Sequence, residues 1–371
     1  IAYNEFYIYV WDWLMWSHCC VDGFSIYFIM FTTFSVFICV CASWKLDFKS
    51  RCSEYFVLFF IMEFFLMHVF TQQNLFFFFI FFEAVLIPMF ILIGVWGSRT
   101  EQRFDAACRF FMYTFVGSVA MLIAIFYIYA LHFNLDWFYF FNYQEFWLWL
   151  AFSISFLVKI PLVPFHTWLP EAHVEAPTPV SMFLAGVLLK MGGYGYLHFC
   201  LVMFPFASKN NVSIFICLCL LSMIYASWCA LCHIDLKKIV AYSSIAHMGF
   251  AMLGLAGSPS VAGLLGSAIM MISHGFVSMG LFFSVGFLYE RYGVRNITYY
   301  SNISAIHPVF ASFFLFFCFA NIAFPGTSSF VAEFVLLISF ANRWPVLIMF
   351  TCVAIIFSAV YTIWMYNRLC W

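Results

Sequence analysis

Long apolar runs separated by short polar connections make up most of this chain. Cutting the sequence at charged residues, Pro and Asn leaves eleven runs, at 24–43, 54–71, 75–96, 107–131, 146–165, 179–202, 213–232, 239–257, 261–288, 306–340 and 346–366. A helix needs about 20 residues to cross about 30 Å of hydrocarbon, and lipid tolerates only segments whose backbone hydrogen bonds are satisfied internally. The pattern predicts an all-α polytopic membrane protein with about eleven transmembrane helices.

The composition agrees with this prediction. Hydrophobic residues make up 66% of the 371 positions and charged residues only 8%, whereas soluble chains carry about 25% charged residues. A water-soluble fold is therefore excluded. The net charge of −1 gives no support for a nucleic-acid partner.

The basic residues provide an independent check on the predicted spans. If the cuts are right, Lys and Arg should accumulate on alternate connections. One side receives only Lys209 and Arg343, and the other receives eleven: Lys45, Lys49, Arg51, Arg99, Arg103, Arg109, Lys237, Lys238, Arg291, Arg295 and Arg368. This asymmetry predicts that the C-terminus lies on the cytoplasmic side of a bacterial membrane or the matrix side of a mitochondrial one.

Two of the predicted spans are interrupted. Pro161 and Pro164 follow Lys159 in the fifth span, and Pro325-Gly326 precede Glu333 in the tenth. Broken helices in lipid usually line a polar cavity. The breaks are five helices apart, and a repeat with an odd number of helices starts the next repeat from the opposite side of the membrane. We therefore predict two inverted five-helix repeats at 54–202 and 203–371, after an N-terminal segment with the first helix at 1–53.

Ionisable side chains lie deep within the predicted spans. At about 1.5 Å per residue, Glu83, Lys190 and His247 are each roughly 13–17 Å from the nearest span end, and His274 is near the middle of its run. An unpaired charge there costs several kcal/mol, so such residues usually mark an ion path. Taken alone, any one of these residues could instead belong to a static ion pair or be a buried core histidine. An alternating series favours proton transfer, and we predict a relay of Glu83, Lys159, Lys190, His247, His274 and Glu333.

Motifs around these residues resemble those of one known family. The clearest is the segment 157–181, LVKIPLVPFHTWLPEAHVEAPTPVS, and further ones are FEA at 82–84 with Pro88, LAGVLLKMGGYG at 184–195, AYSSIAHMG at 241–249, SHG at 273–275 and FPGTSSF at 324–330 before Glu333. These motifs closely resemble the antiporter-like subunits of respiratory complex I. The resemblance covers about residues 21–371.

The resemblance implies a proton-translocating membrane-arm subunit driven by quinone reduction elsewhere in the complex. It implies that Glu83 pairs with Lys159, that Lys190 relays across the centre, that His247 and His274 continue the path, and that Glu333 ends it. No cofactor is expected on this chain, while FMN, iron–sulfur clusters and ubiquinone belong to other subunits. Expected partners are the other membrane-arm subunits, including neighbouring antiporter-like ones, and lipids. The expected location is the mitochondrial inner membrane, with the C-terminus on the matrix side.

The chain also departs from the family pattern. Members typically have fourteen spans, so two or so would be missing before Val21 and one after Trp371, and a separate chain is a possible source of the N-terminal helices. Two other functions remain open: a cation/proton antiporter subunit of the same superfamily, and a membrane scaffold that has lost transport. Glu63 and His68 fit either a helix interface or a proton side branch.

Two metal or cofactor interpretations are weak. Glu171, His173 and Glu175 have the i, i+2, i+4 spacing of ligands on an extended strand, but they lie in an expected membrane-surface turn between Pro170 and Pro177. Cys229, Cys232 and His233 form a CxxCH sequence like a haem attachment site, at the end of an apolar span. We therefore predict no metal and no haem on this chain.

Overall fold

The chain folds into membrane-length helices. The computed structural model describes residues 9–14, 17–45, 51–98, 101–137, 145–258, 260–341 and 343–371, so Lys49 and Arg99 of the charge pattern lie outside the described residues. Within these ranges nine helices are long and apolar enough to cross a membrane, and three more apolar helices are shorter. Two of the short helices, Pro308–Asn321 and Ser328–Ala341, together form the tenth predicted span. The third, Phe146–Lys159, forms the first part of the fifth predicted span. The predicted helical membrane fold with two broken spans is confirmed.

The helices belong to two compact units. Unit 1 comprises Ile1–Lys159, Glu175–Phe183 and Val187–Asn211, and unit 2 comprises Ile160–Val174, Leu184–Gly186 and Val212–Trp371. Each is described by itself below. The domain boundaries drawn from the sequence after residues 53 and 202 stay predictions.

Unit 1 begins with a β-hairpin that the apolar pattern does not predict. Strands β1 and β2 pair antiparallel, with Tyr9 opposite Val21. The elements of this unit are β1 (Tyr9–Leu14), β2 (Ser17–Val21), α1 (Gly23–Ala42), η2 (Ser43–Lys45), α2 (Cys52–Thr71), α3 (Leu75–Ala84), α4 (Leu86–Trp96), α5 (Gln102–His132), α6 (Phe146–Lys159), α8 (Thr178–Phe183), α9 (Leu189–Gly195), η5 (Tyr196–Cys200), α10 (Leu201–Met203) and α11 (Pro205–Asn210).

The third predicted span has one distorted turn at Val85, between α3 and α4, although Val85 keeps helical dihedral angles and residues 75–96 form one membrane-length helix. Pro88 lies four residues after Ala84, has no N–H to donate to the Ala84 carbonyl, and its ring would clash with that carbonyl in a continuous helix. The distorted turn lies close to Glu83, within a span that remains one helix.

The span from Thr178 to Met203 combines α-helical and π-helical turns. The π-helical turns are η4 (Leu184–Leu188) and η5, on either side of α9. Every residue from 178 to 200 is buried. Isolated π turns in helices are frequent at functional sites, and here they flank the helix that carries Lys190.

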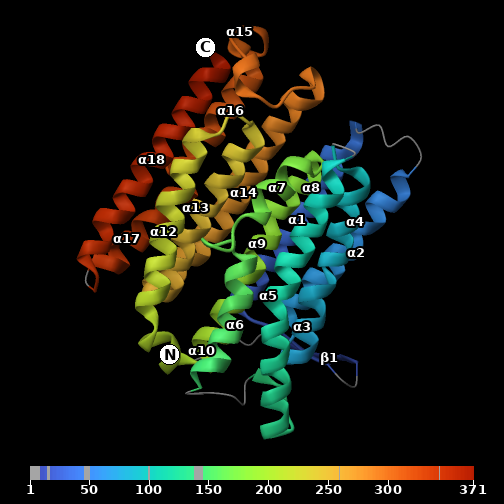
Figure 1. Cartoon of the computed structure of the whole chain (residues 1–371), viewed down its shortest axis with the longest axis vertical. Helices are drawn as coiled ribbons and strands as arrows, with labels where there is room; N and C mark the ends of the chain where they lie inside the picture. The colour runs from blue at the N-terminus through green and yellow to red at the C-terminus, as the bar shows by residue number, and fades with distance from the viewer. Residues whose placement is uncertain are drawn as a thin grey trace. The chain divides into compact units, whose positions relative to one another are not determined.

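Unit 2 is built around three long helices. Its elements are α7 (Trp168–Glu175, of which residues up to Val174 belong to this unit), α12 (Val212–Cys232), α13 (Leu236–Gly257), α14 (Val261–Tyr292), η6 (Ile297–Tyr299), α15 (Ile303–Ile306), α16 (Pro308–Asn321), α17 (Ser328–Ala341) and α18 (Pro345–Cys370). Helix α13 packs between α12 and α14, and α14 also packs against α17 (Figure 1).

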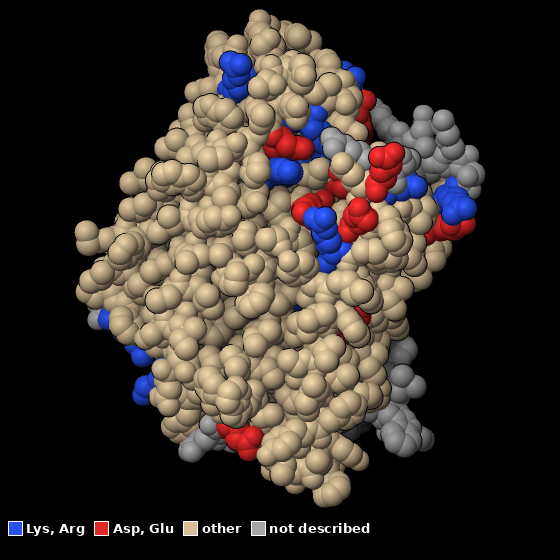
Figure 2. Space-filling model, in the orientation of Figure 1, with Lys and Arg blue, Asp and Glu red and all other residues tan. Residues whose placement is uncertain are grey.

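The outer helix faces are apolar, as a lipid-exposed protein requires. On α16, for example, Phe313 and Phe316 are 63% and 60% exposed. Figure 2 shows that Lys, Arg, Asp and Glu occupy only small areas of the face in view. The exposed aromatic side chains therefore form an apolar surface of the kind that faces lipid.

Candidate functional site

In unit 1 a carboxylate and an amine meet inside the spans. Lys159 Nζ lies 3.9 Å from Glu83 Oε1, and these side chains are only 4% and 13% exposed. The ammonium also lies 4.4 Å from the centre of the Phe82 ring. The structure therefore brings together the first two residues of the predicted relay.

The position of Lys159 follows from the local sequence. Lys159 is the last residue of α6, because Pro161 and Pro164 prevent the helix from continuing. Helix α5 packs against α6, and Gly117 permits this contact, since a Cβ at position 117 would lie 2.9 Å from Val158 Cγ2.

Lys190 lies on α9, which packs against α6 in the same unit. Its side chain is 0% exposed. Tyr194, one helical turn further on, donates its hydroxyl hydrogen to the Phe70 carbonyl at 2.9 Å. This places a second buried lysine in unit 1, on the helix next to the one that ends at Lys159.

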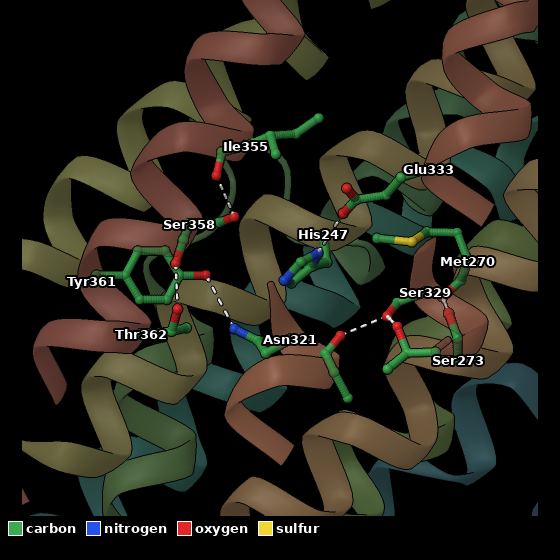
Figure 3. Close-up of polar contacts among 12 residues, drawn as sticks. His247, Met270, Ser273, Asn321, Ser329, Glu333, Ile355, Ser358, Tyr361 and Thr362 are labelled. Atoms are coloured by element: carbon green, nitrogen blue, oxygen red, sulfur yellow. Dashed lines mark hydrogen bonds and ion pairs between the residues drawn. The ribbon is translucent and has the colours of Figure 1, made fainter. Parts of the chain in front are cut away.

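In unit 2 the two predicted histidines and Glu333 form one cluster. His247 Nδ1 lies 3.9 Å from Glu333 Oε1, and the rings of His247 and His274 are 5.6 Å apart. All three residues are less than 10% exposed. Figure 3 shows His247 of α13 pointing toward Glu333 of α17. The structure therefore also brings together the last three residues of the predicted relay.

The break before Glu333 is held by hydrogen bonds at its ends. Helix α16 ends at Asn321 and α17 begins at Ser328, and Gly326 between them has a φ of 103°, a conformation that glycine adopts readily. The Ser329 hydroxyl donates to the Ala320 carbonyl at 2.5 Å (Figure 3). Glu333 therefore lies in the second turn of a helix whose start is tied to the end of the preceding one.

Three residues weighed as metal ligands lie on a helix, not in a turn as expected. Glu171, His173 and Glu175 all belong to α7, where Glu171 and Glu175 share one face and His173 points to another side. The ring of His173 stacks on Phe282 at 4.4 Å, and Glu175 accepts a hydrogen bond from the Ser98 hydroxyl. Among the described residues no group of three or more His, Cys, Asp or Glu side chains is arranged to hold a metal ion.

Other candidate residues are partly buried and polar in character. The His68 ring of α2 stacks on Phe81 of α3 at 4.5 Å, which is a contact between two helices. His68 Nδ1 also lies 3.4 Å from the Gln72 amide nitrogen. Glu63, on the same helix as His68, is only partly buried. His233 of the CxxCH sequence stacks on Tyr242 at 4.9 Å. Partial burial, with a further contribution from Lys238, lowers the pKa of His233.

One polar contact of unit 1 was not predicted. His198 Nε2 lies 3.3 Å from Asp22 Oδ2, next to a cavity of about 20 Å³ lined by Gln73, Tyr194 and Trp137 among others. Asp22 also caps α1, since its carboxylate accepts a hydrogen bond from the Ser25 N–H at 2.7 Å. The sequence offers a signal for the cap, because Asp22 precedes an apolar run, but none that pairs residues so far apart.

Comparisons with known proteins agree with the motifs. The family described as NADH:quinone oxidoreductase/Mrp antiporter, transmembrane, matches residues 72–358. The NADH-ubiquinone oxidoreductase chain 4 of Chondrus crispus is 48% identical over 354 residues, covering 94% of this chain and 71% of that protein. The NADH-quinone oxidoreductase subunit M of Rickettsia conorii is 43% identical, covering 95% and 72%.

Solved structures match this chain over nearly the same length as these relatives. A chain of respiratory complex I from Thermus thermophilus has a TM-score of 0.87 at 29% identity, covering 95% of this chain and 75% of that one. A chain of the Mrp complex from Dietzia has the same TM-score at 19% identity, which shows a shared fold alone. Among the antiporter-like subunits, the motif sequences of this chain are predicted to be most similar to those of subunit 4 of complex I. The chain 4 relatives confirm this prediction. The chain therefore belongs to the NADH:quinone oxidoreductase/Mrp antiporter transmembrane family.

Proposed function

We propose that this chain is a proton-translocating membrane-arm subunit of an NADH:quinone oxidoreductase. The observation that carries the proposal is the buried Glu83–Lys159 pair, 3.9 Å apart, at the point where α6 ends. A salt bridge with an amine that is 4% exposed is a poor way to hold helices together, because its desolvation offsets the attraction. It is well suited to a group whose proton affinity must change.

The proposed path runs through Glu83, Lys159 and Lys190 in unit 1 and through His247, His274 and Glu333 in unit 2. The order across the two units follows the family resemblance. At an effective dielectric of about 20, an opposite charge at 4 Å contributes about 4 kcal/mol. Moving one charge against 100 mV costs about 2.3 kcal/mol. Because the interaction within the pair is larger, forming and breaking the Glu83–Lys159 contact changes the free energy enough to drive release and recapture of a proton at Lys159.

Redox chemistry belongs to other subunits in this proposal. FMN, iron–sulfur clusters and ubiquinone would be held there, and this chain would respond to quinone reduction through its membrane-arm neighbours, including other antiporter-like subunits. We further propose the mitochondrial inner membrane as the location, with the C-terminus on the matrix side and lipid around the apolar faces. A separate chain that supplies the helices before Val21 is a possible additional partner.

The test is the replacement of Lys159 by Met in the assembled complex. We expect NADH-driven proton transport into vesicles to be lost, because the variant removes the proton-carrying amine and leaves a side chain of similar length. The amount of assembled complex should be unchanged. Lys209→Met, at an exposed position of α11, is the matched control and should transport normally. A normal ratio of protons to electrons in Lys159→Met would reject the proposal.

Two other functions make different predictions. A cation/proton antiporter, for which the Mrp-type fold is the supporting observation, would exchange Na⁺ for protons without NADH. Adding Na⁺ to vesicles that hold a pH gradient would then dissipate the gradient. A scaffold without transport would tolerate Lys159→Met with no change in any transport measurement.

A further inference from the structure

In unit 1, three polar side chains follow one another from the buried Lys190 to one end of the unit. Tyr194 lies one turn after Lys190 on α9, so the two side chains are on the same face. The ring of His198, in the π-helical turn η5, lies 4.2 Å from the ring of Tyr194. His198 Nε2 lies 3.3 Å from Asp22 Oδ2, so the series continues to the start of α1.

The series leads from the interior to the surface. Lys190 is 0% and His198 4% exposed, whereas 25% of the Asp22 side chain is exposed. The distance along the helix from Lys190 to His198 is about 12 Å. Helix α1 runs from Asp22 to the basic connection that holds Lys45, so Asp22 lies at the end of the unit opposite the basic connections.

A small polar cavity lies where the series reaches Asp22. Its volume is about 20 Å³, and Asp22, Gln72, Tyr194 and His198 are among its lining residues. Within the described part of the chain, the buried atoms His198 Nε2 and Gln72 Oε1 have no hydrogen-bond partner, apart from the ion-pair contact of His198 with Asp22. A water needs about 10–15 Å³ and two to four polar partners, so the cavity can hold one water that bonds to both atoms.

Packing alone does not require a histidine here. The rings of Phe28, Phe70 and Tyr194 already join α1, α2 and α9, with centres 5.0–5.9 Å apart. Burial of an imidazole costs free energy that an apolar side chain of the same size would not cost. Asp22 is also fixed in place, because its Oδ1 accepts from the Ser25 N–H and leaves Oδ2 for the imidazole.

We propose that Tyr194, His198 and Asp22 form an opening of the proton path, through which Lys190 exchanges protons with the aqueous phase opposite the basic connections. For each proton passed outward, Lys190 changes from ammonium to amine and a water at the surface gains the proton. The Tyr194 hydroxyl accepts one proton and gives up another, so it stays neutral. His198 takes up the proton beside the Asp22 carboxylate and then releases it through the cavity water. The inference rests on the proposed function, since Lys190 belongs to its relay.

The test is His198→Gln in the assembled complex, with the ratio of protons transported to electrons transferred measured in vesicles. Glutamine keeps an N–H donor beside Asp22, but its amide does not take up a proton. We expect the ratio to fall as far as in Lys159→Met, with a normal amount of assembled complex. His132→Gln, at the exposed end of α5, is the matched control and should transport normally.

Asp22→Asn tests the outer end of the same opening. Asparagine keeps the cap of α1 and removes the carboxylate, so this variant decides the question if His198→Gln does not assemble. We expect its ratio to fall, and the double variant to lose no more than His198→Gln alone, because both residues act in one path. A normal ratio in either assembled variant, or losses that add in the double variant, would overturn the proposal.

Lys159→Met distinguishes failure of this inference from failure of the proposed function. If Lys159→Met and His198→Gln both transport normally, the proposed function fails as well. Loss of transport in Lys159→Met with a normal ratio in His198→Gln rejects only the opening at Asp22.

Discussion

At the scale of single residues, the two clusters are built differently. Lys159 has a carboxylate at 3.9 Å and an aromatic face at 4.4 Å, so its charge is supported by two kinds of contact. His247 has a carboxylate on one side and a second imidazole on the other. Unit 1 therefore holds an ion pair. Unit 2 holds a series of imidazole and carboxylate groups, which ordinarily bind protons more weakly than a lysine amine does.

Asp22 carries two roles that a single substitution can separate. Its carboxylate caps α1 in a reciprocal arrangement, because the Asp22 N–H also donates to the Ser25 hydroxyl, and it lies 3.3 Å from His198. Asp22→Ala removes both contacts, and we expect the free energy of unfolding to fall by about 1–2 kcal/mol. Thermal unfolding of the purified complex measures the change.

Asp22→Asn is the control for this prediction. Asparagine is as good a helix cap as aspartate but carries no charge to pair with His198. If Asp22→Asn is as unstable as Asp22→Ala, the ion pair dominates and our assignment of most of the stabilisation to the cap is wrong.

At the scale of elements, helix contacts set the geometry of the Glu83–Lys159 pair. Gly117 of α5 lies against Val158, the residue before Lys159, with no room for a Cβ. Gly117→Ala should push α5 from α6, displace the end of α6 that carries Lys159 and destabilise the contact by about 1–3 kcal/mol. We expect less assembled complex and slower proton transport per complex.

A compensating substitution tests the cause of this effect. Val158→Ala removes the two methyl groups, at 2.9 and 3.3 Å from a Cβ at position 117, and leaves only the Val158 Cβ at 3.1 Å. The double variant should recover much of the assembly lost in Gly117→Ala. Equal losses in the single and the double variant would show that the crowding at Val158 is not the cause.

The elements also show what the sequence can predict and why. The spans and the breaks after Lys159 and before Glu333 were predicted, because apolar length and proline each leave a local signal. The pairing of Glu83 with Lys159 was expected from the family resemblance. The distorted turn at Val85 was not predicted, since Pro88 lies in a long apolar run that otherwise indicates one continuous helix. The Asp22–His198 and Asn321–Tyr361 contacts join residues 176 and 40 positions apart, and no local pattern encodes such pairs.

At the scale of the whole molecule, the two units hold separate groups of the proposed path. Glu83, Lys159 and Lys190 belong to unit 1, and His247, His274 and Glu333 belong to unit 2. The roles of all six remain proposals, which transport measurements on the assembled complex can test. The central claim is that Lys159 releases its proton during turnover.

Lys159→Arg tests that claim most directly. Arginine keeps the positive charge and the contact with Glu83, but it does not give up its proton in proteins. The measurement is the ratio of protons transported to electrons transferred by the assembled complex in vesicles. We expect Lys159→Arg to assemble and to oxidise NADH in detergent, with proton transport through this subunit lost. A ratio equal to that of the unmodified complex would contradict the account, because the charge alone would then be sufficient.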